Sequence, residues 1–199
     1  MAKTDPNEFK KLISTYLKPK AGKVEEIHIP RFKYIMVDGE GEPASEAYSA
    51  AIQGLYNHAY TIKFLPKSGA AVAGYEPFSV ASLQGLYGKF EDGWKWTLMI
   101  AVPDFINHDT IAQAREEMKR KGKAVNEAVQ LKDWEEGDVL QTLHVGPYDK
   151  EQPTIDILQS YAKEHGYTLV GRQDEIYMND PRRVAPDKIK VIIRYQVKR

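Results

Sequence analysis

A glutamate in a strand-like segment near the C-terminus is the residue best placed to do chemistry. Glu175 is followed by Ile176 and Tyr177, and the turn-forming run Asn179-Asp180-Pro181 comes next. If its side chain points to solvent, the carboxylate is merely hydrated. If it points inward, burial favours the neutral acid unless a cation or hydrogen-bond donors hold the charge, and such carboxylates tend to mark sites. An inward Glu175 could pair with a cation or activate water as a general base.

Aromatic side chains are candidates to line the same site. Tyr177 follows Glu175 by two residues, so strand alternation places both on one face and puts a phenol beside the carboxylate. Tyr87 holds the matching place earlier in the chain, and either tyrosine could equally be a core aromatic. Trp94 and Trp96 share one strand face. We favour Trp96 as a ligand contact because Trp94 lies near a turn, although a core role for the pair is an equal alternative.

Two further candidates flank the Gly146-Pro147 turn. His144 could act as an acid or base or line the rim of a cleft, or it could anchor the turn. Tyr148 shares the face of His144 if the strand extends that far, and we include both as ligand-binding residues. The histidines and carboxylates lack a metal-type spacing, and there is no phosphate-binding loop and no nucleophile elbow. We therefore expect no metal and no cofactor.

The composition is that of an ordinary folded protein. Of the 199 residues, 42% are hydrophobic and 28% are charged. Lys plus Arg and Asp plus Glu both number 28, so the formal net charge is zero and nucleic-acid binding is disfavoured. The chain has no cysteine, which excludes disulfides and Cys-zinc sites and fits a cytoplasmic location. We find no signal peptide and no apolar segment long enough to span a membrane.

Hydrophobic periodicity predicts the elements that position these residues. Helices are predicted over 8–17, with Asp5 and Pro6 at its start, 44–64, 107–121, with Asn107 or Asp109 as its cap, and 154–165. Strands are predicted over 24–29, 32–37, 75–87, 94–102, 139–145, 168–178 and 189–197. Among these, 32–37 and 189–197 are expected to be edge strands that could pair with a second chain, but the oligomeric state stays open.

The two halves of the chain repeat one order of elements, β-α-β-β. The triplet Gly85-Leu86-Tyr87 in the first half matches Glu175-Ile176-Tyr177 in the second, which indicates an internal duplication of about 100 residues. We expect one domain over 1–199. Its parts are an N-terminal helix and lead-in over 1–25, a first module over 26–103, a linking helix and loop over 104–138, and a second module over 139–199.

Four motifs carry a resemblance to a known family. They are Asp38-Gly39-Glu40-Gly41-Glu42-Pro43, Leu83-Gln84-Gly85-Leu86-Tyr87, residues 141–149, and residues 175–183 with the following Ala185-Pro186-Asp187-Lys188. In these the chain resembles stand-alone GyrI-like small-molecule-binding proteins of the SOUL/GyrI-like effector-binding superfamily, over almost its whole length. It departs from them at Leu86-Tyr87-Gly88, where related stand-alone proteins tend to carry one Trp or two.

The resemblance implies an α+β fold with pseudo-two-fold symmetry, in which the antiparallel sheets of two tandem β-α-β-β modules enclose a ligand cleft and the helices lie on the outer side. It also implies that a central buried glutamate, here Glu175, meets cationic aromatic drugs. Relatives are often fused to a helix-turn-helix module, for which we expect no room in the roughly 25 residues before the first module.

The resemblance implies three functions. The first is capture of amphipathic or cationic aromatic compounds, as a drug sensor, a sink or a regulator-like effector domain. The second is detoxifying hydrolysis of cyclopropane-bearing compounds, in which Glu175 would be the general base and Tyr177 a second catalytic residue. A protein-binding topoisomerase inhibitor is a weaker third. The expected partner is a small aromatic or cationic molecule, with no nucleic acid and no membrane.

Overall fold

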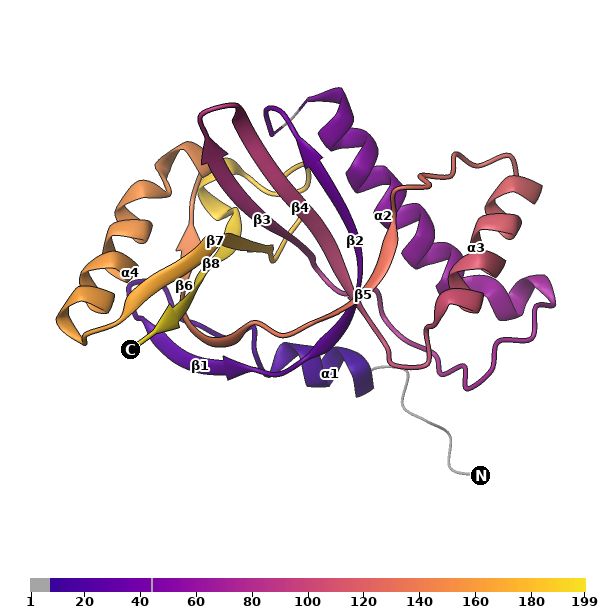
Figure 1. Cartoon of the computed structure of the whole chain (residues 1–199), viewed down its shortest axis with the longest axis horizontal. Coiled ribbons are helices and arrows are strands. Elements are labelled where there is room, and N and C mark those ends of the chain that lie inside the picture. Colours follow the sequence, from indigo (N-terminus) through magenta and orange to yellow (C-terminus); the bar gives the residue numbers. More distant parts are fainter. Residues whose placement is uncertain (1–7, 44) are drawn as a thin grey trace. The chain divides into compact units, whose positions relative to one another are not determined.

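A computed structural model describes residues 8–43 and 45–199, and within them the protein is α+β (Figure 1). The helices are α1 (Glu8–Ser14), α2 (Glu46–Phe64), α3 (His108–Arg120) and α4 (Gln152–Glu164), and the short 3-10 helices are η1 (Leu65–Ser68), η2 (Tyr148–Lys150) and η3 (Pro186–Lys188). The strands are β1 (Glu25–Ile29), β2 (Phe32–Glu40), β3 (Leu83–Phe90), β4 (Gly93–Val102), β5 (Gln130–Trp134), β6 (Gly137–Val145), β7 (Thr168–Tyr177) and β8 (Lys190–Lys198).

The strands form an antiparallel sheet in the order β1-β6-β8-β7-β3-β4-β2-β5. The two predicted modules are β2-α2-β3-β4 and β6-α4-β7-β8, and exchanging equivalent strands makes the order read the same from both ends. The matching triplets meet where β3 pairs with β7, because Gly85 lies directly opposite Glu175. The predicted duplication is therefore present in the order of the strands.

Several predicted boundaries differ from the observed ones. Residues 75–82 are not a strand, and β2 runs past its predicted end at residue 37 to Glu40. Strand β5 is missed, since Gln130–Trp134 is mostly exposed and polar and has no apolar alternation to reveal it. The edges of the sheet are β1 and β5, so the prediction of edge strands at 32–37 and 189–197 is wrong.

The predicted helices are all present. Asn107 is the cap of α3, because its side chain accepts a hydrogen bond from the backbone N–H of Thr110 at 2.9 Å. The cap predicted at Asp5 and Pro6 lies outside the described residues. Among the helices that the structure describes, none has the length and apolar character needed to cross a membrane.

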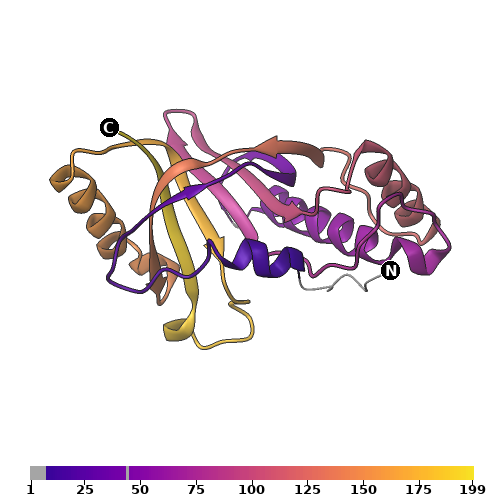
Figure 2. The same ribbon diagram turned by 90° about the horizontal axis from the view of Figure 1, so that it is seen from below.

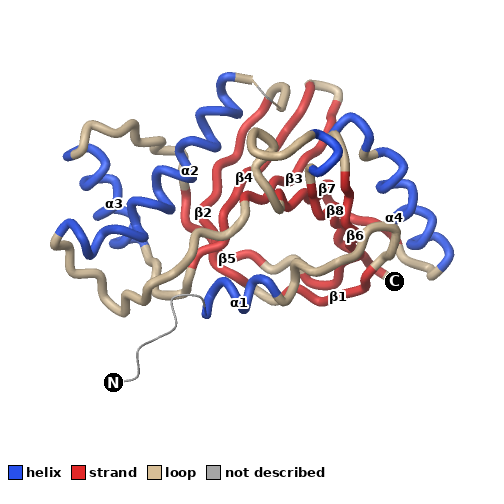
Figure 3. The backbone as a smooth tube through the Cα atoms, turned by 180° about the vertical axis from the view of Figure 1, so that it is seen from behind, coloured by secondary structure: helices blue, strands red, loops and turns tan. Residues whose placement is uncertain are grey.

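The described residues divide into two compact units. The first comprises the described parts of residues 1–15, 32–81 and 89–134, and the second comprises 16–31, 82–88 and 135–199. In the first unit, α2 packs on β2 and β4, and α3 packs beside α2 (Figure 3). Its buried core includes Ile35, Leu55 and Ile100. Organisation as one domain over 1–199 stays a prediction.

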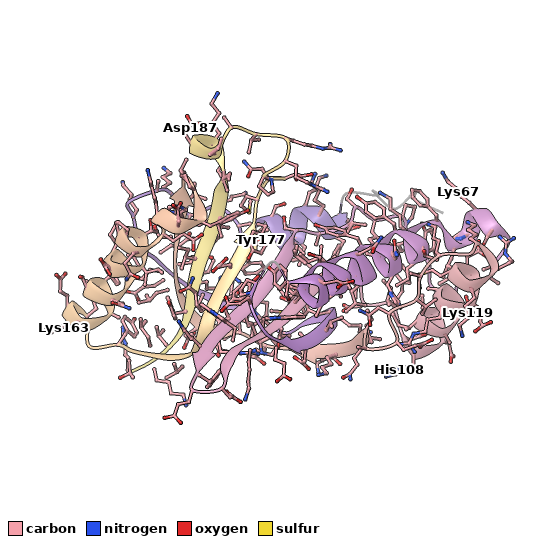
Figure 4. All side chains as sticks on the ribbon, turned by 90° about the horizontal axis from the view of Figure 1, so that it is seen from above. Lys67, His108, Lys119, Lys163, Tyr177 and Asp187 are labelled. Atoms are coloured by element: carbon pink, nitrogen blue, oxygen red, sulfur yellow. The ribbon has the colours of Figure 1, made fainter. Side chains whose placement is uncertain are left out.

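In the second unit, α4 lies across one face of the strands (Figure 2). The core beneath it is built from Leu140, Leu158, Val191 and Ile193, which are fully buried. Alternate residues of β8 therefore face α4, and the β7 residues paired with them share that face. The η3 turn between β7 and β8 carries Asp187, labelled in Figure 4, away from this core.

The opposite face of the second unit carries a buried polar cluster. It consists of Gln84, Glu136, Gln141, Asp174 and Arg194, none more than 6% exposed. Arg194 donates hydrogen bonds to Glu136 and Gln141, and the amide of Gln84 donates to Asp174 at 2.8 Å and to Glu136 at 3.0 Å. One cation thus meets two carboxylates, and burial together with the charge of Glu136 raises the pKa of Asp174 well above its usual value.

Candidate functional site

The side chain of Glu175 lies on the face of β7 that α4 covers. Glu175 pairs with Ile193 and Tyr177 with Val191, and both of these β8 residues belong to the core under α4. Asp174 and Ile176 point to the opposite face and are buried there. Glu175 itself is half-buried, so the inward orientation considered from the sequence is the one that occurs.

Two chains of hydrogen bonds end on the Glu175 carboxylate. The hydroxyl of Tyr177, labelled in Figure 4, donates to Glu175 Oε2 at 2.8 Å, and the hydroxyl of Tyr87 lies 2.6 Å from that of Tyr177. On the other side, Gln173 Nε2 donates to Glu175 Oε1 at 2.8 Å, and the Tyr195 hydroxyl donates to Gln173 Oε1 at 2.7 Å. Because the single hydroxyl hydrogen of Tyr177 is donated to Glu175, the Tyr87 hydroxyl must be the donor in the hydrogen bond to Tyr177.

Gly85 makes room for the first of these chains. A Cβ added at Gly85 would lie 2.4 Å from the Tyr87 hydroxyl oxygen, because the Tyr87 side chain crosses directly over this residue to reach Tyr177. The asymmetry between Gly85 and Glu175 therefore has a steric meaning. Glu175 carries the carboxylate. Gly85, which lies opposite, has no side chain, and the Tyr87 ring fills that space to reach Tyr177, the donor to Glu175.

We expect Gly85→Ala to break the hydrogen bond between Tyr87 and Tyr177. The methyl group must push the buried Tyr87 ring aside, and overpacking of this kind costs about 1–3 kcal/mol. Urea unfolding of the two proteins measures the loss. The matched control is the same substitution in a Tyr87→Ala background, where the clash is absent and the loss should largely vanish. An equal loss in both backgrounds would show that the clash is not its cause.

Burial and hydrogen bonding have opposite effects on the pKa of Glu175. Burial raises the pKa of Glu175, and the hydrogen bonds from Tyr177 and Gln173 oppose this rise. Within the described residues, no Lys, Arg or His forms an ion pair with Glu175, although surface carboxylates such as Asp180 do form such pairs. The carboxylate therefore has donors for both oxygens but no countercharge.

A second buried carboxylate, Glu151, belongs to the same region and was not predicted from the sequence. It is 8% exposed, and its Oε1 is buried without a hydrogen-bond partner among the described residues. Burial first, and then the charge of Glu175, raise the pKa of Glu151 to about 8. Burial and the charges of Glu175 and Glu151 also raise the pKa of Tyr195 to about 12.

No sequence signal marks Glu151. It precedes Gln152-Pro153 at the start of α4, and an acid before a helix with Pro in its first turn is the usual solvated arrangement. Here the side chain makes no cap hydrogen bond to the helix. Only the folded structure shows that it turns inward.

His144 has a structural role at the end of β6. Its Nε2 donates to the carbonyl of Pro147 at 3.1 Å, and its Nδ1 is hydrogen-bonded to the Thr154 hydroxyl of α4 at 2.9 Å, so both ring nitrogens are engaged. It anchors the turn, one of the three roles considered from the sequence. Tyr148 lies in η2, not on an extended strand, and is 39% exposed. Its ring meets Tyr177 edge-on at 6.1 Å between centroids.

Most of the chain matches the model of a known family. The model for the GyrI-like small molecule binding domain matches residues 22–198. The chain belongs to this family. A comparison with curated protein sequences finds no match.

Several solved structures are similar to this protein in fold. A hydrolase from Listeria innocua is 34% identical, with 96% of this chain and 98% of that one covered and a TM-score of 0.89. An uncharacterized conserved protein from Listeria innocua is 36% identical over the same shares, also with a TM-score of 0.89. The C-terminal domain of EcmrR is 14% identical over 89% of this chain and 98% of that one, with a TM-score of 0.57, and shares the fold alone.

Of the predicted site residues of this GyrI-like chain, all but one lie in the second unit. Tyr87, Tyr177 and Glu175 are linked by hydrogen bonds, and Tyr148 touches Tyr177. Trp96 belongs to the first unit, where it is 2% exposed. Its ring lies over Gly39 and meets Tyr48 edge-on at 5.3 Å between centroids. The ligand-binding roles of these residues, Trp96 and His144 included, stay predictions.

Proposed function

We propose that this GyrI-like domain captures amphipathic, cationic aromatic compounds, with Glu175 as the anion that meets the positive charge. The observation that carries the proposal is a half-buried carboxylate that holds two hydrogen bonds but no pairing cation within the described residues. An uncompensated charge of this kind is costly in the empty protein, and a ligand cation removes that cost.

The surroundings of Glu175 favour an aromatic ligand over a small ion. The exposed ring of Tyr148 stands edge-on against Tyr177, whose hydroxyl holds the carboxylate. Ring faces next to an anion suit a flat cation, because stacking and cation–π attraction add to the ion pair. The hydrogen-bond chains that begin at Tyr87 and Tyr195 hold the Glu175 carboxylate in place before a ligand binds. Binding therefore costs little further side-chain entropy.

The test compares a flat aromatic cation with a neutral molecule of the same shape. We expect Glu175→Gln to weaken binding of the cation by about 10- to 100-fold and to leave the neutral analogue almost unchanged, as measured by calorimetry or fluorescence titration. Glu164→Gln, which removes an exposed charge from α4, is the matched control and should not alter either affinity. An equal loss for both compounds in Glu175→Gln would contradict the proposal, since the charge would then play no part.

A second candidate function is hydrolysis of a cyclopropane-bearing electrophile. Two Listeria innocua proteins, 34% and 32% identical to this chain, carry the description of a hydrolase. Glu175 would take a proton from water while the water oxygen bonds to a ring carbon. The carbon–carbon bond of the ring breaks, and its electron pair moves to a conjugated carbonyl of the ligand. Once Glu175 has taken the proton, it no longer needs the hydrogen bond from Tyr177, whose hydroxyl can then donate to that carbonyl oxygen and stabilise the developing charge.

Turnover separates the two functions. Wild-type protein incubated with a cyclopropane-bearing electrophile should form the ring-opened, hydrated product by mass spectrometry, and Glu175→Gln should form none if the carboxylate is the base. Binding without product in wild type identifies the protein as a sensor or sink for such compounds.

A further inference from the structure

We infer that Glu151 is a second carboxylate of this site and that a cation bound at Glu175 displaces a proton from Glu151 to the solvent. This inference rests on the proposed capture of cations and adds a property to it. The site would then take up charge in two stages, with one anion present when it is empty and a second that forms when a cation arrives.

The start of α4 holds Glu151 on the face of the sheet where Glu175 lies. Its carbonyl accepts hydrogen bonds from the backbone N–H of Thr154 at 2.8 Å and of Ile155 at 3.0 Å, which fixes Glu151 at the first turn. The Thr154 hydroxyl is hydrogen-bonded to His144 of β6, so this turn is tied to the sheet. Three residues before Glu151, the ring of Tyr148 meets Tyr177, the hydrogen-bond donor to Glu175.

The environment of Glu151 disfavours its charge while the site is empty. The side chain is 8% exposed and Oε1 has no partner among the described residues, so an ionised carboxylate would be both desolvated and incompletely hydrogen-bonded. The groups that face it are Glu175 from β7 and Tyr195 from β8, one anionic and one neutral, while both ring nitrogens of His144 of β6 are already hydrogen-bonded elsewhere. No cation balances Glu151 within the described residues.

Glu175 and Glu151 therefore hold one proton between them, and it resides on Glu151. Glu175 has two hydrogen-bond donors and keeps the charge, whereas Glu151 has an oxygen without a donor and keeps the proton. A permanent cation placed against Glu175 cancels the repulsion that keeps Glu151 protonated. Binding of the cation then favours ionisation of Glu151, and by linkage the affinity for cations rises with pH while that for neutral molecules does not.

The experiment measures proton release by calorimetry. A quaternary aromatic cation, which has no proton of its own, is titrated into the protein at pH 7 in buffers of different ionisation enthalpy, and a neutral molecule of the same shape is titrated in parallel. For wild type we expect proton release with the cation only, and an affinity for the cation that rises by about 10-fold or more between pH 6 and pH 8. Glu151→Gln should still bind the cation, with no proton release and a flat pH profile.

The outcomes distinguish this inference from the proposed function. Cation binding without proton release in wild type, or release that persists in Glu151→Gln, overturns the role of Glu151 and leaves capture by Glu175 standing. A cation that fails to bind, or that binds equally well to Glu175→Gln, overturns both. Glu164→Gln, which loses an exposed carboxylate from the same helix, should release protons as wild type does.

Discussion

Replacing Arg194 by Met is expected to lower the free energy of unfolding by about 3–5 kcal/mol, because it leaves buried carboxylates without their cation. Arg194 is 2% exposed and is the central donor of the buried polar cluster. Its Nε and Nη2 bond to Gln141 Oε1 at 3.0 and 2.7 Å, its Nη2 bonds to the carbonyl of Tyr16 at 3.1 Å, and its Nη1 bonds to Glu136. Asp174 lies 3.8 Å from Nη1.

The size of the loss follows from what stays behind. Met fills much of the volume of Arg, so the cavity cost is small, but the carboxylate of Glu136, which is 3% exposed, loses its ion pair with Arg194. Asp174 contributes less, because its raised pKa already favours the neutral acid. The missing countercharge of Glu136 is therefore the main source of the instability.

Urea unfolding at pH 7 measures this loss, and a second substitution checks its cause. Glu136→Gln in the Arg194→Met background removes the stranded charge and should restore part of the stability, whereas Glu164→Gln, an exposed change of the same kind, should restore none. A loss below about 1 kcal/mol would mean that water or rearrangement compensates the charge.

The side-chain neighbours on β7 show how far the site could be predicted. Strand alternation alone predicts that Glu175 and Tyr177 share a face, and the hydrogen bond between them confirms it. Duplication predicts that Tyr87 is the counterpart of Tyr177, and their hydroxyls lie 2.6 Å apart. These relations follow from period and repeat, which a single sequence contains.

Contacts between distant segments were beyond the sequence. Strand alternation would also place Gln173 on the face of Glu175, but Tyr195, which completes the second chain of donors, comes from another strand, β8, and shows no motif. The inward turn of Glu151 depends on how α4 begins, and an acid at that position usually faces water. Strand β5 was not predicted because an exposed, charged edge strand lacks the apolar alternation that reveals other strands.

The pH dependence of stability gives an independent test of the state of Glu151, without any ligand. The pKa of Glu151 is raised from 4.5 to about 8 in the folded protein. For an acid whose pKa is higher when folded, the unfolded chain loses its proton first as the pH rises. The folded state is therefore favoured most below pH 4.5, and that contribution is lost between pH 4.5 and about 8.

Glu151→Gln should consequently match wild type at pH 4.5 and exceed its free energy of unfolding by up to about 4 kcal/mol at pH 8.5, since Gln never ionises. Guanidinium unfolding at both pH values measures the difference. Other carboxylates with raised pKa, Glu175 and Asp174, shape the profile of both proteins, so only the difference between them reports on Glu151. Glu164→Gln should run parallel to wild type at every pH. A difference that stays constant with pH would mean that Glu151 has the same pKa in the folded and unfolded protein. It would then be ionised at pH 7, and a cation arriving at Glu175 would have no proton to displace.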